Sequence, residues 1–231
     1  EEDQIMNMLT IDTATEACSV ALQYNGKVYT RYEVCPQQHS QKILTMVDEV
    51  MQEAGAKMKS LDVLGFGRGP GSFTGVRIAT GIIQGLALGA KLPVVGVSTL
   101  HAMAQQVISS QSADNVAVAI DARMSEVYFA RYQNINGIAE LLGEEQVLPP
   151  EQAATQVTEQ TSVFAGTGWQ AYPALTEVQG EAVVSVTYPY ARHMLPLVER
   201  AYEAGETMTA ESITPVYLRD TVTWKKLPGR E

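Results

Sequence analysis

The sequence predicts an α/β fold made of two related lobes. Strand-like and helix-like patterns alternate along the first half of the chain, which is typical of α/β architecture. The same succession of patterns begins again near the middle, which indicates an internal duplication. A length of 231 residues, of which 45% are hydrophobic, is enough for the cores of two small lobes.

The first strands are expected in the segment MLTIDTATEACSVALQYNGKVYTRYEV, which begins at Met8 and is rich in alternating and β-branched residues. Asn25-Gly26 is a strong signal for a two-residue hairpin turn. Polar residues at 12–16 predict an earlier turn. We therefore expect strand, turn, strand, tight hairpin and strand, in this order.

Helices and buried strands are expected to alternate after this hairpin. HSQKILTMVDEVMQEAG repeats apolar residues on one helical face and ends at Gly55. LDVLGFG and LPVVGV are predicted to be short buried strands. Ser72 is a suitable cap for a helix that runs to about Leu88, and Ser98 or Thr99 for the helix STLHAMAQQVISS.

The second half repeats the plan of the first. VAVAIDARMSEVYFARYQ follows the pattern of MLTIDTATEACSVALQYN: an apolar strand, an Ile-Asp pair that ends at Asp121 or Asp12, a polar turn and a second strand. Later segments predict a helix from near Pro150, a strand in SVFAGTGW and a helix that ends at Gly205. Pro196 lies in the early turns of that last helix.

The composition and charge of the chain limit which molecules it is expected to bind. The formal net charge is −10, and nonspecific affinity for nucleic acid comes mostly from Lys and Arg, so we expect no RNA or DNA binding without a basic partner. Cys18 and Cys35 lack metal or redox spacing and are expected to be small buried residues in a reducing compartment. No apolar run approaches the ~20 residues of a membrane span. The acidic start lacks the basic region of a signal peptide, so we expect a cytoplasmic protein that binds no membrane.

The glycine-rich stretch GRGPGSFTGVR, which begins at Gly67, matches neither G-x-G-x-x-G nor G-x-x-x-x-G-K-[ST]. Two interpretations remain open and are of equal weight. The backbone N–H groups at the start of the following helix could bind a phosphate. Alternatively, the glycines and Pro70 serve only a tight crossing from strand to helix.

The helix that follows carries Gly81, Gly85 and Gly89 at four-residue intervals. Each glycine inside a helix costs about 0.5–1 kcal/mol relative to alanine. Close approach of another backbone would explain them. The approaching element is either the sheet of the same chain or a helix of another chain, and we expect both contacts together.

Catalytic candidates are few. The three histidines, His39, His101 and His193, are scattered, and no His-x-x-x-His pair occurs. Asp12 and Asp121 end equivalent strands and, in a two-lobed fold, would face each other across a cleft, where they could hold a hydrated Mg²⁺. Alternatively, each carboxylate supports only its own turn.

Five segments carry a resemblance to a known family: IDTATEACSVAL, GRGPGSFTGVRIATGIIQGLALG, AIDARMSEVYFA, GTGW and PVYLRD. Their order and content resemble the TsaB (YeaZ) family of bacterial tRNA threonylcarbamoyladenosine biosynthesis proteins over essentially the whole chain. The resemblance implies a duplicated actin/Hsp70-like (ASKHA, ribonuclease H-like) α/β fold, each lobe a mixed β-sheet flanked by helices. The implied lobes are residues 1–108, joined by the tail 212–231, and residues 109–211.

The resemblance also implies a function. Members of this family act as non-catalytic scaffold or activating subunits with TsaD, which transfers the threonylcarbamoyl group to the tRNA adenosine beside the anticodon, and with the ATPase TsaE. In TsaD a similar glycine loop is followed by a His-x-x-x-His metal pair, whose positions fall here on Thr99 and Met103. No catalytic residue, metal or required cofactor is therefore expected. Weak binding of adenine nucleotide or Mg²⁺ at Asp12, Thr13 and Asp121 is left open, and tRNA is reached only through TsaD.

The implied partner surface is a small helical bundle in the first lobe, used for a homodimer when the chain is alone and for TsaD in the working complex. The expected interface residues are Ile43, Met46, Val47, Val50, Phe73, Arg77, Ile78, Gly81, Ile82 and Gly85.

Two other functions are kept as alternatives. An ASKHA-type ATPase or phosphotransferase would use Asp12, Thr13 and Asp121, and would hydrolyse ATP as a pure protein. A peptidase is the weaker alternative, because Thr99 and Met103 stand where the resemblance places the two metal-binding histidines.

Overall fold

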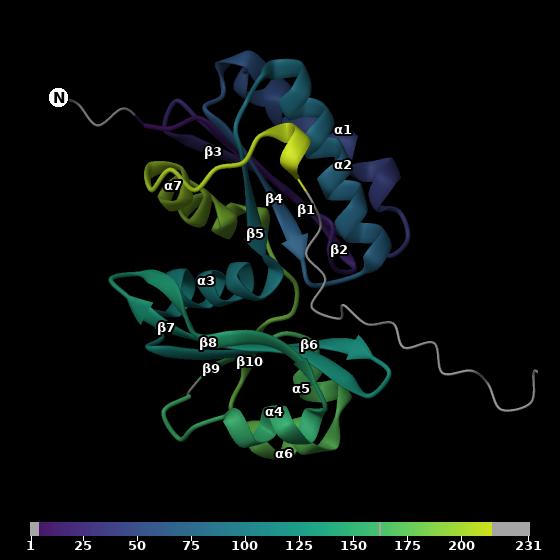
Figure 1. The fold of residues 1–231 in the computed structure, drawn as a ribbon, viewed down its shortest axis with the longest axis vertical. Coiled ribbons are helices and arrows are strands. Elements are labelled where there is room, and N and C mark those ends of the chain that lie inside the picture. The colour runs from purple at the N-terminus through teal and green to yellow at the C-terminus, as the bar shows by residue number, and fades with distance from the viewer. Residues whose placement is uncertain (1–4, 162, 214–231) are drawn as a thin grey trace, which may run out of the picture.

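The computed structural model describes residues 5–161 and 163–213 and shows two lobes, each built on a five-stranded sheet (Figure 1). The first sheet has the order β3-β2-β1-β4-β5 and the second β10-β9-β6-β7-β8. Read from the opposite end, the second order is β8-β7-β6-β9-β10, so each sheet places its first strand in the centre. The predicted internal duplication and the predicted fold class are confirmed.

The first sheet is mixed. β2 pairs antiparallel with both β1 and β3, whereas β4 pairs parallel with β1 and β5. The hairpin between β2 and β3 turns at Asn25 and Gly26, whose φ angles of 50° and 80° are those of the predicted tight turn. The strands of this sheet are β1 (Met8–Asp12), β2 (Ala17–Tyr24), β3 (Lys27–Val34), β4 (Val63–Gly69) and β5 (Val94–Ser98).

Helices cover both faces of the first sheet (Figure 1). Two long helices pack on one face, and a short 3-10 turn followed by α7 packs on the other. The elements on the first face are α1 (His39–Ala54), the 3-10 turn η1 (Met58–Ser60) and α2 (Phe73–Ala90); those on the second are η2 (Ala191–Met194) and α7 (Leu195–Glu203).

The second sheet repeats this arrangement. β7 pairs antiparallel with β6 and β8, while β9 pairs parallel with β6 and β10. Helix α3 covers one face, and a core around the buried indole of Trp169 lies on the other. The elements are β6 (Asn115–Arg123), β7 (Glu126–Ile135), β8 (Ile138–Leu148), β9 (Val163–Ala165), β10 (Val184–Val186), α3 (Thr99–Gln111), α4 (Pro150–Gln156), α5 (Gly168–Ala171) and α6 (Pro173–Gln179).

The lobes exchange helices, which the expected boundaries 1–108 and 109–211 did not anticipate. Helix α3 packs on the second sheet, because Leu100 and Met103 are buried against it. Residues 191–211, expected in the second lobe, return to the first, where Val198 of α7 is fully buried. Burial of these apolar faces, and not position along the chain, decides which lobe each segment joins.

The end of the described chain lies along the first lobe. Met208 forms an antiparallel bridge with Val94, and the 3-10 turn η3 (Ala210–Ser212) packs on α2. The predicted return of the tail 212–231 is therefore described only as far as residue 213, and residues 214–231 lie outside the described part of the structure.

Several elements differ from the expectation. Helix α2 continues past Leu88 to Ala90 and ends at Lys91, which adopts a left-handed φ of 56°. The helix predicted before Gly205 is divided into η2 and α7, and Pro196 lies in the first turn of α7. The sequence did not indicate β8, α5, α6 or β10.

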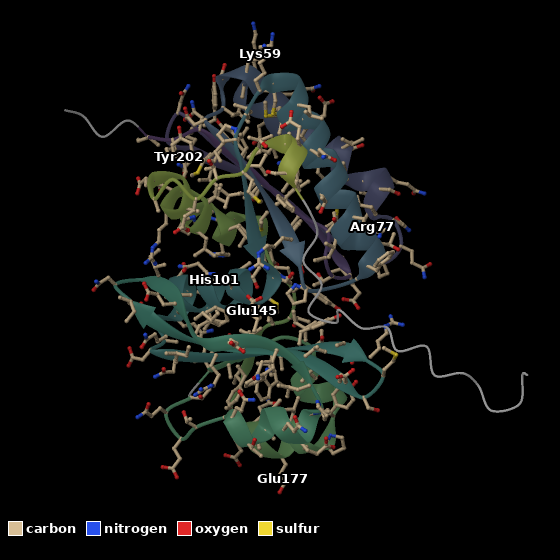
Figure 2. The ribbon with its side chains drawn as sticks, in the orientation of Figure 1. Lys59, Arg77, His101, Glu145, Glu177 and Tyr202 are labelled. Atoms are coloured by element: carbon tan, nitrogen blue, oxygen red, sulfur yellow. The ribbon has the colours of Figure 1, made fainter. Side chains whose placement is uncertain are left out.

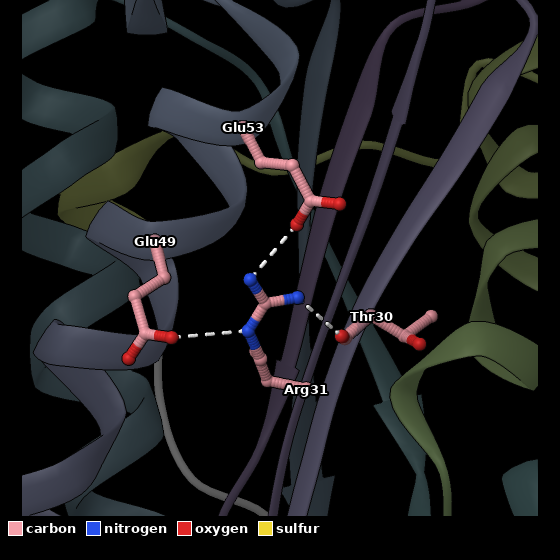
Figure 3. A network of polar contacts seen from close by, with 4 residues as sticks. All are labelled: Thr30, Arg31, Glu49 and Glu53. Carbon is pink, nitrogen blue, oxygen red and sulfur yellow. Dashed lines mark hydrogen bonds and ion pairs between the residues drawn. The ribbon is translucent and has the colours of Figure 1, made fainter.

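Charged contacts join separate elements within the first lobe and across the two lobes. Arg31 of β3 donates from Nε to Glu49, at 3.1 Å, and from Nη2 to Glu53, at 2.8 Å, which ties the edge strand to α1 (Figure 3). Between the lobes, Arg68 of β4 lies 3.9 Å from Glu145 of β8. Figure 2 shows Glu145 close to this boundary between the lobes.

Helix α2 is long and apolar enough, with mean hydropathy 1.2 over 18 residues, to cross a membrane by length and composition alone. About a third of it is buried inside the structure. Ala79, Ile83 and Ala87 pack in the core of the first lobe, which is the arrangement of a helix that covers a sheet.

Candidate functional site

The glycine-rich loop closes around the turn between β1 and β2. A Cβ atom added at Gly67, Gly71 or Gly75 would lie closer than 3.0 Å to atoms of residues 12–14. Real side chains do not reach such distances without displacing the neighbouring atoms, and at Gly71 and Gly75 the neighbours are carbonyl oxygens. These glycines are required because another part of the same chain approaches them.

Hydrogen bonds hold this contact. The backbone N–H of Ser72 donates to the carbonyl oxygen of Ala14 at 2.8 Å, and Thr13 Oγ1 donates to the carbonyl oxygen of Gly75 at 2.5 Å. Ser72 also caps α2 as predicted, since its Oγ accepts from the N–H of Gly75 at 3.1 Å. Of the two interpretations left open by the sequence, the structure favours the tight crossing over the phosphate cradle.

Asp12 and Asp121 occupy equivalent positions but different environments. Each carboxylate accepts a hydrogen bond from the backbone N–H two residues later, on Ala14 at 3.1 Å and on Arg123 at 2.9 Å. Both therefore support their own turns, as one of the two readings expected. Asp121 is exposed and also accepts from Tyr172 Oη at 2.7 Å.

The carboxyl group of Asp12 is enclosed, with 1% of the residue exposed, and Oδ2 has no hydrogen-bond partner in the described structure. Burial raises the pKa of Asp12 to about 7, against the opposing effect of the hydrogen bond from Ala14. Thr13 is fully buried beside it. Two of the three cleft candidates are thus shielded by the glycine loop, and within residues 5–161 and 163–213 no group of three or more His, Cys, Asp or Glu is arranged to hold a metal.

The histidines are held in separate places. His39 Nε2 lies 2.6 Å from the carbonyl oxygen of Thr15, and His101 Nε2 lies 2.5 Å from that of Ala139. Burial lowers the pKa values of His101 and His193. None of the three shares a site with another histidine, as the sequence indicated.

Thr99 and Met103 lie on α3, where the family resemblance aligns them with the metal-binding histidines of TsaD. Both are fully buried, and Met103 packs in the core of the second lobe with Leu100 and Val118. The hydroxyl of Thr99 is buried without a hydrogen-bond partner in the described structure. Neither side chain is open to a substrate.

The expected interface residues of α1 require correction. Ile43, Met46, Val47 and Val50 are at most 7% exposed and pack in the core of the first lobe. The periodicity correctly identified an apolar face, but that face covers the protein's own sheet. These four side chains are therefore not available to a partner.

The expected interface residues of α2 divide into two groups. Phe73, Arg77, Gly81 and Gly85 are exposed, whereas Ile78 and Ile82 are half-buried against the core. Arg77 stacks its guanidinium over the ring of Phe73, with Cζ 3.8 Å from the ring centroid. A Cβ added at Gly81, Gly85 or Gly89 would meet no atom of residues 5–161 or 163–213 within 4 Å, so this part of the chain leaves the stripe of three glycines on α2 uncovered.

Two further exposed apolar side chains, one on each of these helices, were missed. Leu44 of α1 is 54% exposed and Leu88 of α2 is 51% exposed. Leu44 lies off the apolar face of its helix, among Gln41, Thr45 and Asp48, which are also exposed. An apolar residue on a polar helical face was the signal that could have found it.

Comparison with known proteins relates the whole chain to one family. The chain is 48% identical to the tRNA threonylcarbamoyladenosine biosynthesis protein TsaB of Escherichia coli, over 98% of this chain and 100% of that protein. It is 45% identical to TsaB of Haemophilus influenzae, over 99% of this chain and 100% of that protein. The chain belongs to the TsaB family.

Other comparisons place this TsaB-family chain among related proteins. Residues 29–226 match the TsaD family, described as tRNA N6-adenosine threonylcarbamoyltransferase. A solved structure of YeaZ from Pseudomonas aeruginosa is similar, with a TM-score of 0.83 and 43% identity over 91% of this chain and 100% of that chain. A second structure from that organism, described as an uncharacterized protein similar to peptidase YeaZ, has a TM-score of 0.84 at 43% identity, over 93% of this chain and 100% of that chain.

Proposed function

We propose that this TsaB-family chain is a non-catalytic scaffold or activating subunit. It acts with TsaD and TsaE in transfer of the threonylcarbamoyl group to the tRNA adenosine beside the anticodon, in the cytoplasm. Family membership supports the pathway, because close relatives are named for tRNA threonylcarbamoyladenosine biosynthesis.

The non-catalytic role rests on the identity and burial of two residues of α3. Thr99 and Met103 occupy the positions that the resemblance assigns to the metal pair of TsaD, and both are buried in the protein. A threonine and a methionine are poor ligands for a catalytic metal, and a catalytic metal also needs a position open to substrate. On this proposal the transferase chemistry belongs to TsaD.

The charge of the chain supports an indirect relation to tRNA. A net charge of −10 repels the phosphate backbone, so tRNA is bound by TsaD and not by this chain.

The exposed stripe of α2 is the proposed contact surface, both for a homodimer and for TsaD. It joins an aromatic side chain, Phe73, to glycines at 81 and 85 over which a second helix can approach closely. Leu88, three residues after Gly85 on the same helix, extends the apolar area. A partner helix would cover these side chains.

No cofactor is required on this proposal. An adenine nucleotide or Mg²⁺ could bind only weakly, since Asp12 and Thr13 are enclosed by the glycine loop and Asp121 alone of the three candidates is exposed. This enclosure also weighs against the ATPase or phosphotransferase alternative, which would use Asp12 and Thr13.

Reconstitution tests the proposal. Threonylcarbamoyl transfer to tRNA is measured with TsaD and TsaE, with and without this chain, and ATP hydrolysis is measured with this chain alone. We expect transfer to depend on the chain and the chain alone to hydrolyse no ATP. Transfer at full rate without the chain would refute the activating role, and ATP turnover that Asp12→Ala abolishes would support an enzyme.

The contact surface is tested with Gly85→Trp, because the open space at this position lets the indole extend outward without disturbing the fold. We expect a folded protein that neither dimerises nor co-purifies with TsaD. Gln152→Trp, which adds the same side chain to an exposed position of α4, is the matched control and should retain both contacts. A charge at Val47 is unsuitable for this test, because the side chain is buried.

A further inference from the structure

A polar cavity of about 530 Å³ lies at the junction of the lobes, away from the stripe of α2. Strands β2 and β3 contribute from the first lobe, β10 from the second, and Gln106 of α3 and the connection into η2 complete the wall. Its volume is within the range of small-molecule sites in proteins. The lining residues are Ser19, Thr30, Arg31, Tyr32, Gln106, Ser185, Val186, Thr187, Tyr188, Tyr190, Arg192 and His193.

The wall of this cavity differs in charge from the rest of the chain. Among the described residues that line it, none is Asp or Glu, although the chain has 26 acidic residues. The wall offers hydroxyl groups, one amide and three basic residues, Arg31, Arg192 and His193. Such a wall favours ligands that are negatively charged and accept hydrogen bonds.

Arg192 supplies the positive charge that the cavity presents. No carboxylate of residues 5–161 or 163–213 lies within ion-pair distance of its guanidinium, and its charge contributes to the lowered pKa of His193. Arg31 differs, since its guanidinium contacts Glu49 and Glu53 on α1 (Figure 3).

The aromatic part of the wall is held in place. The rings of Tyr32 and Tyr190 stack with centroids 3.8 Å apart and planes at 9°. Gln106 Oε1 accepts from the backbone N–H of Tyr190 at 3.2 Å, which ties the connection into η2 to α3. Burial raises the pKa of Tyr32 to about 12. A tyrosine hydroxyl is in any case protonated at neutral pH and can both donate and accept hydrogen bonds.

We propose that this cavity binds a small hydroxylated organic oxyanion, a phosphate ester or a carboxylate, with Arg192 as its charge partner. The ligand bridges the lobes, because its site is built from both. The proposal is independent of the role in tRNA modification and of the contact surface on α2.

Calorimetric titration tests this site with two probes on the full chain: ribose 5-phosphate for the phosphate source and citrate for the carboxylate source. We expect one of them to bind and Arg192→Gln to weaken that binding by about tenfold or more. Lys59→Gln removes the same charge at the far end of the first lobe (Figure 2) and should leave the affinity unchanged. The proposal is overturned if neither probe binds at about 10 mM, or if both variants weaken binding equally.

A second readout locates the ligand. The pKa of His193 is lowered by burial and by the neighbouring Arg192, and a bound anion favours the protonated imidazole. The ring resonance of His193, assigned with His193→Gln, should therefore titrate at higher pH when the probe is saturating. His39 and His101 serve as internal controls. Binding that leaves the titration of His193 unmoved would place the anion elsewhere and refute the site.

Discussion

Alanine substitutions at the glycines of α2 should have opposite effects in its first turn and along its exposed stripe. Gly81 and Gly85 lie on the exposed stripe of α2, where an added Cβ meets no atom of the described residues within 4 Å. Alanine there restricts the unfolded chain and shields the helix backbone, which stabilises a helix by about 0.5–1 kcal/mol per site. The double variant Gly81→Ala, Gly85→Ala should therefore raise the free energy of unfolding of the monomer by about 1–2 kcal/mol.

Gly75 is the matched control in the same helix. Its added Cβ would lie closer than 3.0 Å to the carbonyl oxygen of Thr13, which is backbone and belongs to the buried turn after β1. The turn or the helix must shift, and overpacking of this kind costs about 1–3 kcal/mol. Gly75→Ala should destabilise the chain even though the residue change is identical.

The assay is urea unfolding followed by circular dichroism, at protein concentrations low enough to keep the chain monomeric. The same variants are then compared in association with TsaD, where we expect the Gly81, Gly85 double variant to bind more weakly because its Cβ atoms separate the packed helices. The reasoning is refuted if the double variant is less stable than the natural chain, or if Gly75→Ala is neutral.

Three further predictions concern buried groups. The folded-state pKa of Asp12, about 7, is higher than the unfolded-state value. The protonated carboxyl therefore contributes fully to stability below about pH 4, and this contribution is lost as the pH rises toward and through 7. Asp12→Asn should flatten this part of the stability–pH curve, and an unchanged slope would contradict the raised pKa of Asp12. Arg68→Met removes the cation beside the carboxylate of Glu145, whose side chain is 12% exposed. It should lower the free energy of unfolding, measured by urea denaturation, by about 1–3 kcal/mol. No loss would show that the contact between the lobes is weak. Cys18 and Cys35 are buried free thiols, and burial raises the pKa of Cys18 to about 12. A thiol reagent at pH 8 should therefore label both only as fast as the protein opens. Rapid labelling of the native chain would contradict their burial.

Individual turn and capping residues were sufficient to predict the hairpin and several helix ends. Asn25-Gly26 specified the hairpin, Ser72 the start of α2, and Gly55 the end of α1, where it has a left-handed φ of 62°. Strand β10 and helix α5 have three and four residues, too few for a periodic pattern to be recognised.

Long-range contacts were not predictable in this way. The apolar face of α1 was correctly identified through Ile43 and Val50, but periodicity does not say whether a sheet or a partner covers such a face. Likewise, the glycines from Gly67 to Gly75 indicated a close approach without showing that residues 12–14 make it. The exchange of α3 and α7 between the lobes has the same origin, because it is decided by tertiary burial.

The most direct test of the proposed role is the initial rate of tRNA threonylcarbamoylation with TsaD and TsaE, measured with three forms of this chain. The natural chain and Asp12→Asn should support the same rate, because the buried carboxyl takes no part in the chemistry. Gly85→Trp should reduce the rate to that measured without the chain, because TsaD no longer docks on α2. A rate abolished by Asp12→Asn and unaffected by Gly85→Trp would contradict the account and indicate a catalytic cleft in this chain.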